Sequence, residues 1–349
     1  MSKINVALIY SKKHFDPEKN SDPTLSMTGT ATWAEYFYNY FGSRYKIKYF
    51  DFSEKNSCGN SYQIVCGLAS WNFIKLSWKN LGAKKILIKV NSHPLYRNKR
   101  ILEESKNFRI GLTNECINPF IQLISIWLAD KIILTGNDYI KSTYIKNGVN
   151  SKKIFPISGG ILKNIYIPAF DSRVRKKIKI IYPTSYLGLR KGVLRFFEIC
   201  DLVIDQSPIP LEILITGKSC PELQERIHSV TKKNKEYEIK HWMSHDDLLA
   251  ELQSSHIVAS CSVEEGQPHG VLEAMATGCI PFVTKSCGID LEEKFIVSEW
   301  DLRENSIKLL NLIRECAKGD NSIFQSFSDK VRKTNDWEIV TKKMETLLN

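Results

Sequence analysis

Two glutamates that flank a turn could bind one ligand from two sides. The stretch from Ser262 to Thr284 reads SVEEGQPHGVLEAMATGCIPFVT and holds Glu265 and Glu273, with seven residues between them. A proline suits the first turn of a helix and a glycine suits its end, so we predict a short helix from about Pro268 to Thr277. Glu265 would then lie in the loop before this helix and Glu273 inside it.

The start of this predicted helix is a candidate phosphate site. Gly270, Val271 and Leu272 would carry free backbone N–H groups beside the positive end of the helix dipole. On spacing alone, a loop acid and a surface helix acid in a salt bridge would be the favoured interpretation of the two glutamates. The helix start, the glycine-containing turn and the Gly-Cys-Ile-Pro sequence that follows favour a ligand site instead.

Other candidate residues lie after predicted strands. Arg190 and Lys191 precede Gly192 and an amphipathic helix, and the alternative for them is a basic cap on a surface turn. His93 follows the predicted strand Lys84 to Val90, at the sheet edge where open α/β folds bind ligands. A histidine there could orient a substrate hydroxyl or stabilise charge, and the alternative is a loop histidine without a role. Arg97, Lys99 and Arg100 are interpreted as a solvated face.

Glycines mark two further loops. Gly29 follows the first strand, Ile4 to Ser11, and precedes an aromatic helix, although a capping turn would explain it equally well. Gly217 ends the predicted strand Leu211 to Thr216.

Strand, turn and helix alternate through both halves of the chain. Besides those above, the predicted strands are Tyr45 to Phe52, Gln63 to Leu68, Lys131 to Thr135, a short strand ending at Ile157, Ile178 to Pro183, and SHIVASCS before the opening stretch. The last segment, about Phe327 to Leu348, is predicted to form one amphipathic helix. Alternation of this kind indicates an α/β protein with parallel sheets.

The 349 residues allow two domains, each with its own core. A change to a basic and then β-rich composition places the boundary between about Ile161 and Lys176. Residues 1–170 hold 24 Lys and Arg against 11 Asp and Glu, a balance of +13, whereas residues 171–349 have a balance of −2. The basic half could face nucleic acid, an anionic membrane or a phosphorylated substrate, or it could be only a solvated surface.

The compartment follows from cysteines and hydropathy. Nine cysteines without a Cys-x-x-Cys pair, and no signal peptide, favour a reducing cytoplasm. Cys66, Cys200 and Cys279 lie in apolar runs and are predicted to be buried. The longest apolar stretch, Ile117 to Leu134, contains polar and charged residues and is not expected to span a bilayer.

The motifs resemble those of a known family, the retaining group 1 (family four) glycosyltransferases of GT-B architecture. EGQPHGVLEAMATGCIPFV resembles the signature of that family, LADKIILTGNDYIKSTYIKNGVNSKKIFPISGGI its segment before the interdomain hinge, and LRKGVLRFFEI its Lys-Gly phosphate turn. The matching segments run from about Ala129 to Val283, and the early N-terminal region is similar only loosely.

This resemblance implies two Rossmann-like domains whose parallel sheets face each other across a cleft. Residues 1–165 would bind the acceptor and residues 166–327 the nucleotide-sugar donor. The C-terminal helix, residues 328–349, would pack back on the first domain.

The resemblance also implies roles for the candidate residues. Glu265 would contact donor-sugar hydroxyls, Glu273 would hold the ribose, and Lys191, with Arg190, would neutralise the leaving diphosphate. The N–H groups of Gly270, Val271 and Leu272 would bind that diphosphate, with Gly217 and His269 also on the donor side. His93 matches the histidine of the N-terminal domain, and Gly29 the glycine loop near the acceptor.

Three positions depart from the family pattern. Tyr186 stands where an arginine is frequent, so Arg190 is expected to supply that charge. The hinge reads Ser158-Gly159-Gly160 where Asn-Gly is usual. His269 replaces an apolar residue, and it would either tune donor choice or simply pack.

The resemblance therefore implies a sugar transferase that needs no metal or other cofactor, because no Asp-x-Asp is present and cations would replace a divalent ion. The expected partners are a nucleotide sugar, a glycan or lipid-linked glycan and an anionic membrane surface, with no nucleic acid. We expect a peripheral cytoplasmic enzyme of bacterial surface polysaccharide (O-antigen or capsule) synthesis. The alternatives are a non-catalytic GT-B-like subunit and a nucleotide-sugar epimerase of the same fold.

Overall fold

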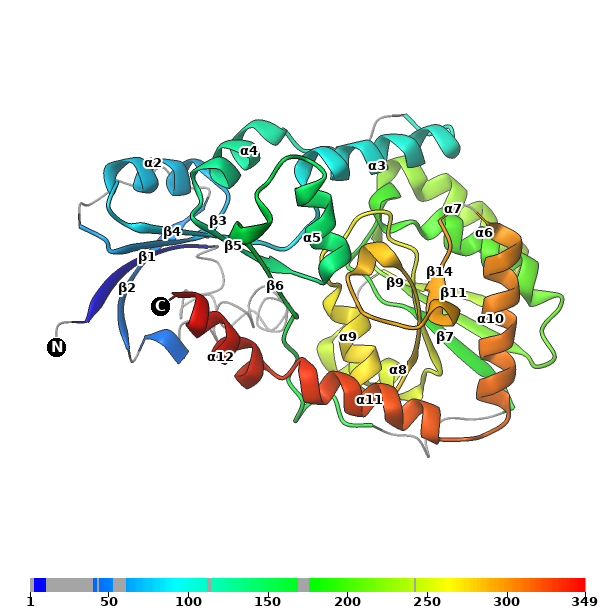
Figure 1. Ribbon diagram of the computed structural model, residues 1–349. Coiled ribbons are helices and arrows are strands. Elements are labelled where there is room, and N and C mark those ends of the chain that lie inside the picture. Colours follow the sequence, from blue (N-terminus) through cyan, green and yellow to red (C-terminus); the bar gives the residue numbers. More distant parts are fainter. Residues whose placement is uncertain are drawn as a thin grey trace. The chain divides into compact units, whose positions relative to one another are not determined.

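Figure 1 shows the computed structural model of the chain, which describes residues 3–10, 40–42, 44–52, 61–111, 114–168, 176–241, 243–299 and 301–348. Gly29 and the aromatic helix predicted after it lie outside these residues. The chain divides into two compact units. Unit 1 comprises residues 1–96, 117–160 and 337–349, and unit 2 comprises residues 97–116 and 161–336.

Unit 1 contains a six-stranded parallel sheet in the order β2-β1-β3-β4-β5-β6. The strands are β1 (Ile4–Tyr10), β2 (Tyr45–Asp51), β3 (Ile64–Leu68), β4 (Lys84–Lys89), β5 (Lys131–Thr135) and β6 (Ile154–Ile157). The helices that begin in this unit are α2 (Trp71–Lys79), α3 (Pro94–Asn107), α4 (Pro119–Leu128), α5 (Asp138–Ile145) and α12 (Trp337–Leu348). From Arg97 onward, α3 belongs to unit 2.

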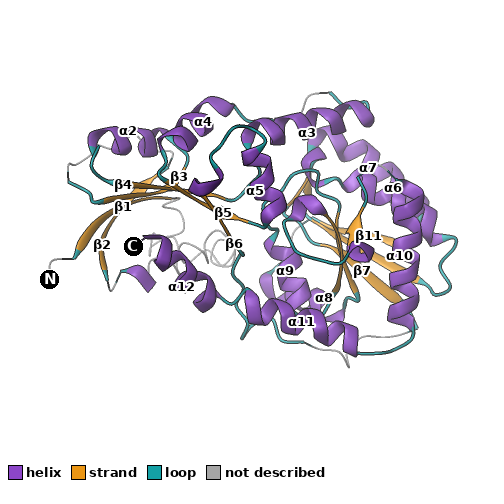
Figure 2. Cartoon of the chain, viewed as in Figure 1, coloured by secondary structure: helices purple, strands orange, loops and turns teal. Residues whose placement is uncertain are grey.

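Helices cover both faces of this sheet (Figure 2). Helices α2 and α4 lie on one face and α12 on the other. Alternate residues of β1 explain the arrangement, because Ala7 and Ile9 pack with Phe73 of α2, while Leu8 points the other way and is equally buried. A parallel sheet buried on both faces needs such near-continuous apolar strands.

Unit 2 repeats the plan with a sheet in the order β11-β9-β7-β12-β13-β14. Its strands are β7 (Ile178–Tyr182), β9 (Leu211–Thr216), β11 (Tyr237–Lys240), β12 (Ile257–Ser260), β13 (Ile280–Thr284) and β14 (Ile296–Val297), with a small separate pair β8 (Tyr186–Leu187) and β10 (Lys218–Ser219). Its helices are α6 (Val193–Ile204), α7 (Pro221–Lys233), α8 (His245–Ser254), α9 (His269–Ala276), α10 (Leu302–Ala317) and α11 (Ser322–Thr334).

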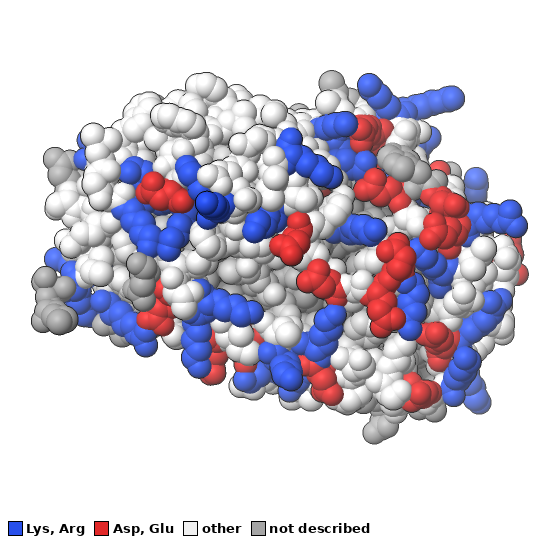
Figure 3. All heavy atoms as spheres, viewed as in Figure 1, with Lys and Arg blue, Asp and Glu red and all other residues white. Residues whose placement is uncertain are grey.

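The α/β class and both parallel sheets confirm the predicted fold class. The predicted strands agree with the observed ones to within a few residues. Cys66, Cys200 and Cys279 are fully buried, as predicted. On the face of unit 2 that Figure 3 shows, acidic and basic side chains are interspersed, as the near-zero charge balance of that half requires.

The prediction of one helix from Phe327 to Leu348 is wrong. Helix α11 ends at Thr334, and α12 begins at Trp337. The break occurs because the Asn335 carbonyl accepts a hydrogen bond of 2.7 Å from the Ile161 N–H, and the Asp336 carboxylate pairs with Lys163. Of the segment 328–349, only residues from Trp337 onward belong to unit 1.

Trp337 packs against the glycine pair that precedes the change of unit. It is 2% exposed, and a Cβ on Gly160 would lie 2.2 Å from its ring. Two lysines hold the other end of α12, since Lys84 and Lys131 donate to the carbonyls of Leu348 and Leu347. Cations at the carbonyl end of a helix are stabilising.

We therefore predict that Gly160→Ala destabilises unit 1. The added methyl group would displace a buried indole ring, and overpacking of this kind costs about 1–3 kcal/mol. Gly82→Ala is the matched control in the same unit, because a Cβ added there would have nothing within 4 Å. Thermal unfolding followed by circular dichroism should show a lower Tm for Gly160→Ala only. Equal Tm values for the two variants would contradict the packing argument.

Candidate functional site

The candidate residues Arg190, Lys191 and Glu265 of unit 2 lie where the order in which strands are added to the sheet reverses. After β7 the chain adds β9 and β11 on one side, then returns to place β12 on the other side of β7. The loops after β7 and β12 therefore leave from neighbouring carboxyl ends, at the switch point where open α/β sheets bind ligands. The first loop carries Arg190 and Lys191, and the second carries Glu265.

Backbone contacts join these two loops. Leu189–Lys191 form a 3₁₀ turn that ends at Gly192 with φ of 68°. A Cβ on Gly192 would lie 1.9 Å from the Cys261 carbonyl oxygen, so only glycine allows this approach. The Val263 N–H donates to the Arg190 carbonyl at 2.9 Å.

The Tyr182 hydroxyl makes a further connection. It donates to the Lys191 carbonyl and accepts a hydrogen bond of 3.0 Å from the Cys261 N–H. Burial raises the pKa of Tyr182 well above its usual value, so the hydroxyl keeps its proton. A buried hydroxyl with both partners fixes the two backbones that it joins.

Glu265 binds both cations of the first loop. Its Oε2 lies 3.0 Å from Nη1 of Arg190 and also pairs with Nζ of Lys191. Burial alone would raise the pKa of this carboxyl, but Lys191 and Arg190 outweigh it and lower the pKa to about 2. Two cations therefore share this one carboxylate oxygen.

The sequence did not reveal three partners of this group. Glu264 is fully buried, with its carboxylate 3.8 Å from Arg97 and 3.9 Å from Arg190. The Arg190 N–H donates to Glu115, and Arg97 donates to the Glu115 carbonyl. The only available signal was the Glu264-Glu265 pair itself, since Arg97 and Glu115 are distant in sequence.

The interpretation of Arg97, Lys99 and Arg100 as a solvated face is wrong for both arginines. Arg97 approaches Glu264, and Arg100, 8% exposed, pairs with Glu103 and Glu299. Lys99 is exposed as expected. On a helix these residues point in different directions, and only Lys99 faces solvent.

Helix α9 begins at His269 and differs from the prediction at its first turn. The N–H groups of Val271 and Leu272 both donate to the Pro268 carbonyl, at 3.1 and 3.2 Å, so they are not free. The prediction failed because the first turn is tightened into a 3₁₀-type bond that uses the Val271 N–H. For Gly270, which packs on Pro183, no backbone acceptor is found among the described residues.

Glu273 has an environment opposite to that of Glu265. Burial raises the pKa of its carboxyl to about 7, although a hydrogen bond from the Tyr166 hydroxyl lowers it. Tyr166 is 3% exposed, and its backbone carbonyl accepts a hydrogen bond of 2.9 Å from Arg332. Near neutral pH, Glu273 is therefore poised between its neutral and ionised forms.

His93, in unit 1, follows β4 as predicted. It is 1% exposed, and its ring packs edge-on against Tyr144 with the ring centroids 5.3 Å apart. Its backbone N–H donates to the Thr143 hydroxyl. Among the described residues its Nδ1 has no hydrogen-bond partner. Burial, with the nearby Lys89, lowers the pKa of His93 to about 4. The ring is thus neutral near pH 7 and suits hydrogen bonding to a hydroxyl better than charge stabilisation.

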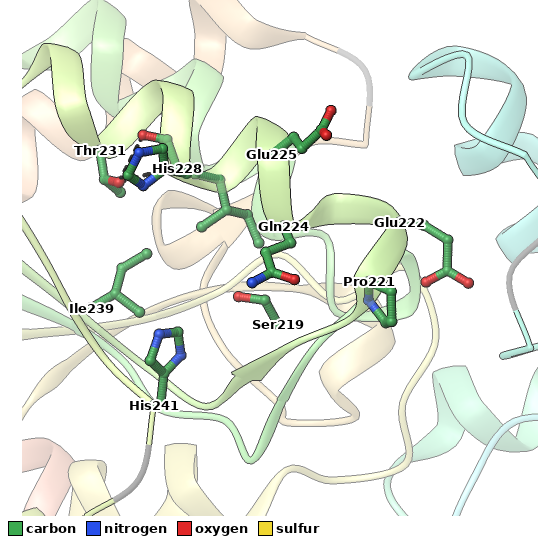
Figure 4. A pocket seen from close by; sticks show the side chains of 10 residues that line it. Ser219, Pro221, Glu222, Gln224, Glu225, His228, Thr231, Ile239 and His241 are labelled. Atoms are coloured by element: carbon green, nitrogen blue, oxygen red, sulfur yellow. Dashed lines mark hydrogen bonds between the residues drawn. The ribbon is translucent and has the colours of Figure 1, made fainter.

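A cavity of about 760 Å³ lies elsewhere in unit 2, between α7 and β11 (Figure 4). Gln224, His228 and His241 are among the side chains that line it, and none of the predicted site residues does. Gly217 lies two residues before Ser219 at its rim, with φ of 116°. Within the described ranges, no three His, Cys, Asp or Glu side chains are grouped as a metal site would need.

Residues 177–315 match a family described as glycosyl transferases group 1. The likeness to this family lies in unit 2 and covers less than half of the chain. The matched residues include Arg190, Lys191, Glu265 and Glu273 but neither Gly29 nor His93.

Solved structures show the same fold. Sucrose-phosphate synthase from Thermosynechococcus elongatus has 13% identity and a TM-score of 0.71, over 99% of this chain and 98% of that one. HepE from Anabaena, in complex with UDP and glucose, has 13% identity and a TM-score of 0.67, over 99% of both chains. A glycosyltransferase from Rickettsia africae has 13% identity and a TM-score of 0.66, over 100% and 98%. No curated protein matches the sequence.

We predict that Tyr182→Phe lowers both the stability of the protein and its turnover of substrate. The change leaves a buried N–H and a buried carbonyl without their partner, at a cost of about 1–3 kcal/mol, and frees the backbone of Lys191. Tyr237→Phe is the matched control, because it removes a buried hydroxyl that donates to Asp201 in the same unit. Resistance to urea unfolding should weaken for both variants, whereas kcat should fall only for Tyr182→Phe. Loss of kcat in both would contradict a positioning role.

Proposed function

We propose that this protein is a glycosyltransferase that moves a sugar from a nucleotide-sugar donor to a glycan or lipid-linked glycan, with retention of anomeric configuration. The observation that carries the proposal is the group of Arg190, Lys191 and Glu265 at the switch point of unit 2. Breaking the glycosidic bond leaves negative charge on the departing diphosphate. Fixed cations in a partly buried site stabilise such charge without having to reorganise.

The two glutamates divide the donor between them in this proposal. Glu265, ionised and held by two cations, accepts hydrogen bonds from hydroxyls of the sugar. Glu273 accepts them from the ribose hydroxyls, a role that needs its ionised form. The N–H of Gly270, at the start of α9, donates to the diphosphate, and His269 and Gly217 lie on the donor side.

Arg190 and Lys191 supply the positive charge that a divalent metal ion gives to other transferases, so the proposed reaction is metal-independent. Burial alone would lower the pKa of Arg190, but the carboxylates of Glu265 and Glu264 raise it, so the guanidinium remains charged. A bound diphosphate would share Arg190 and Lys191 with the Glu265 carboxylate, which already pairs with both cations.

Residues of unit 1 are proposed to serve the acceptor side. The neutral ring of His93 has an unpartnered Nδ1 among the described residues, which suits it to accept a hydrogen bond from a sugar hydroxyl. We propose that the range 1–165 is the acceptor domain and the range 166–327 the donor domain; within the first range, residues 97–116 belong to unit 2.

The structure of HepE with UDP and glucose supports UDP-hexoses as the first donors to test. Synthesis of a bacterial surface polysaccharide by a peripheral cytoplasmic enzyme remains our proposal for the pathway. No helix of the described residues is both long and apolar enough to cross a membrane.

Donor use can be tested with Lys191→Met and a closely matched control. We predict a fall in turnover of about 100-fold or more, as expected when one fixed donor to a developing anion is lost. Lys308→Met is the control, since Lys308 also pairs with a glutamate and its side chain is 13% exposed against 14% for Lys191. Release of UDP from UDP-hexoses measures the effect.

Equal losses in the two lysine variants would remove Lys191 from the reaction. Donor binding in thermal-shift assays without turnover of any donor would favour the non-catalytic alternative. Formation of an epimeric donor in place of transfer would favour the epimerase.

The pKa of Glu273 predicts how donor binding depends on pH. Because the unliganded carboxyl has a pKa of about 7, protons compete with the ribose below that pH, and affinity should fall about tenfold for each pH unit. UDP-glucose is a suitable probe, since its diphosphate diester does not titrate near neutrality. Calorimetric Kd values from pH 8 to 5.5 should follow this slope in the native protein and flatten in Glu273→Gln. A flat profile in the native protein would exclude the ionised carboxylate as the ribose ligand.

A further inference from the structure

Two neighbouring helices of unit 1 expose large aromatic side chains. Trp71 and Trp78 of α2 are 51% and 56% exposed, and Phe120 and Trp127 of α4 are 56% and 75% exposed. Leu81, just after α2, is 78% exposed. Single exposed apolar residues are common, but a contiguous set of this size usually marks an interaction surface.

Both helices present these rings on one face. Trp71 and Trp78 are seven residues apart, as are Phe120 and Trp127, and seven residues are close to two helical turns. The rings of Trp71 and Phe120 lie 6.4 Å apart, so the exposed rings of the two helices adjoin at this pair. We call these four side chains, with Leu81, the aromatic patch.

The inner faces of the same helices are already occupied. Phe73 and Leu76 of α2 and Ile126 of α4 pack into the core of unit 1. Figures 1 and 2 show α2 and α4 beside each other on one face of the sheet. The aromatic patch is therefore not needed for folding of the sheet core, and it faces outward.

The charged residues within the two helices are both lysines, although the exposed Asp130 follows two residues after the end of α4. Lys75 and Lys79 are exposed on α2, and Lys75 lies on the same helical face as Trp71 and Trp78. Neither α2 nor α4 contains an aspartate or a glutamate. In Figure 3, the surface over these two helices is largely free of charged side chains.

We propose that the aromatic patch and its two lysines dock unit 1 onto an anionic lipid surface. Tryptophan rings prefer the boundary between lipid headgroups and acyl chains, and lysines beside them attract anionic headgroups. Helix α4 has ten residues, about half of what a bilayer-spanning helix needs, so it lies along the surface. The inference deepens the proposed function and rests on it for the lipid-linked acceptor that such a surface would present.

Sedimentation of the full chain with vesicles tests this surface. One set of vesicles contains phosphatidylcholine alone, and the other contains about one third phosphatidylglycerol. The native protein should bind the second set, with a bound fraction that falls as salt rises. The double variant Trp78→Ser with Trp127→Ser should lower the bound fraction about fivefold or more.

Two matched controls distinguish the effect of the aromatic patch from the effect of losing any exposed apolar side chains or any exposed lysines. Leu202→Ser with Ile307→Ser removes apolar side chains that are 43% and 50% exposed in unit 2, and it should bind like the native protein. Lys75→Gln with Lys79→Gln should lose the preference for anionic vesicles, whereas Lys232→Gln with Lys233→Gln, at the exposed end of α7, should keep it.

The proposal is overturned if the native protein does not bind anionic vesicles or if the Trp and control variants bind alike. It is also overturned if light scattering shows a dimer that the Trp variant abolishes, without vesicle binding, because the patch would then join two copies. None of these results depends on a nucleotide sugar. A failure of the docking surface is thus distinct from a failure of donor turnover, which is measured without vesicles.

Discussion

One carboxylate with two cations is the interaction on which the site of unit 2 depends. Glu265 pairs with Arg190 and Lys191, which come from a different loop. Burying one of these charges without its partners would cost several kcal/mol, so the three side chains must be placed together. The sheet order achieves this by making β7 and β12 neighbours, and the Gly192 approach and the Tyr182 hydroxyl then fix the loops against each other.

The two glutamates of the opening motif have opposite electrostatic environments. Cations lower the pKa of Glu265 to about 2, whereas burial raises that of Glu273 to about 7. Chemically identical groups in one short segment are therefore suited to different tasks. Glu265 remains ionised at all physiological pH values, whereas the protonation state of Glu273 changes near neutral pH.

Periodicity and end signals predicted the strands and the start of α9 well, because these are local properties. The apolar run from Ile178 to Pro183 by itself predicts a strand. Pro268 and Gly278 by themselves predict the two ends of a helix. The partners of the site were not predictable in this way. Glu115 and Arg97 reach Arg190 and Glu264 through tertiary folding, and no local pattern reports such contacts.

The errors have different origins. A helix from Phe327 to Leu348 fits a 3.6-residue period, but a bond from Ile161, a residue far away in sequence, interrupts it at Asn335. The N–H groups expected to be free at Val271 and Leu272 instead donate to the Pro268 carbonyl, that of Leu272 in the first regular bond of α9 and that of Val271 in a 3₁₀-type bond. The family resemblance gave the motif its chemical meaning, although the roles of its residues stay proposals.

The most direct test of the central claim is a comparison of UDP affinity and donor turnover in Glu265→Gln. In this account Glu265 orients the sugar, while Arg190 and Lys191 bind the diphosphate. Removing the charge of Glu265 therefore frees both cations to pair with the nucleotide diphosphate. The account predicts that UDP binds as tightly as before or more tightly, and that kcat falls about 100-fold or more. Turnover within about threefold of the native value, or loss of UDP binding together with turnover, would contradict it.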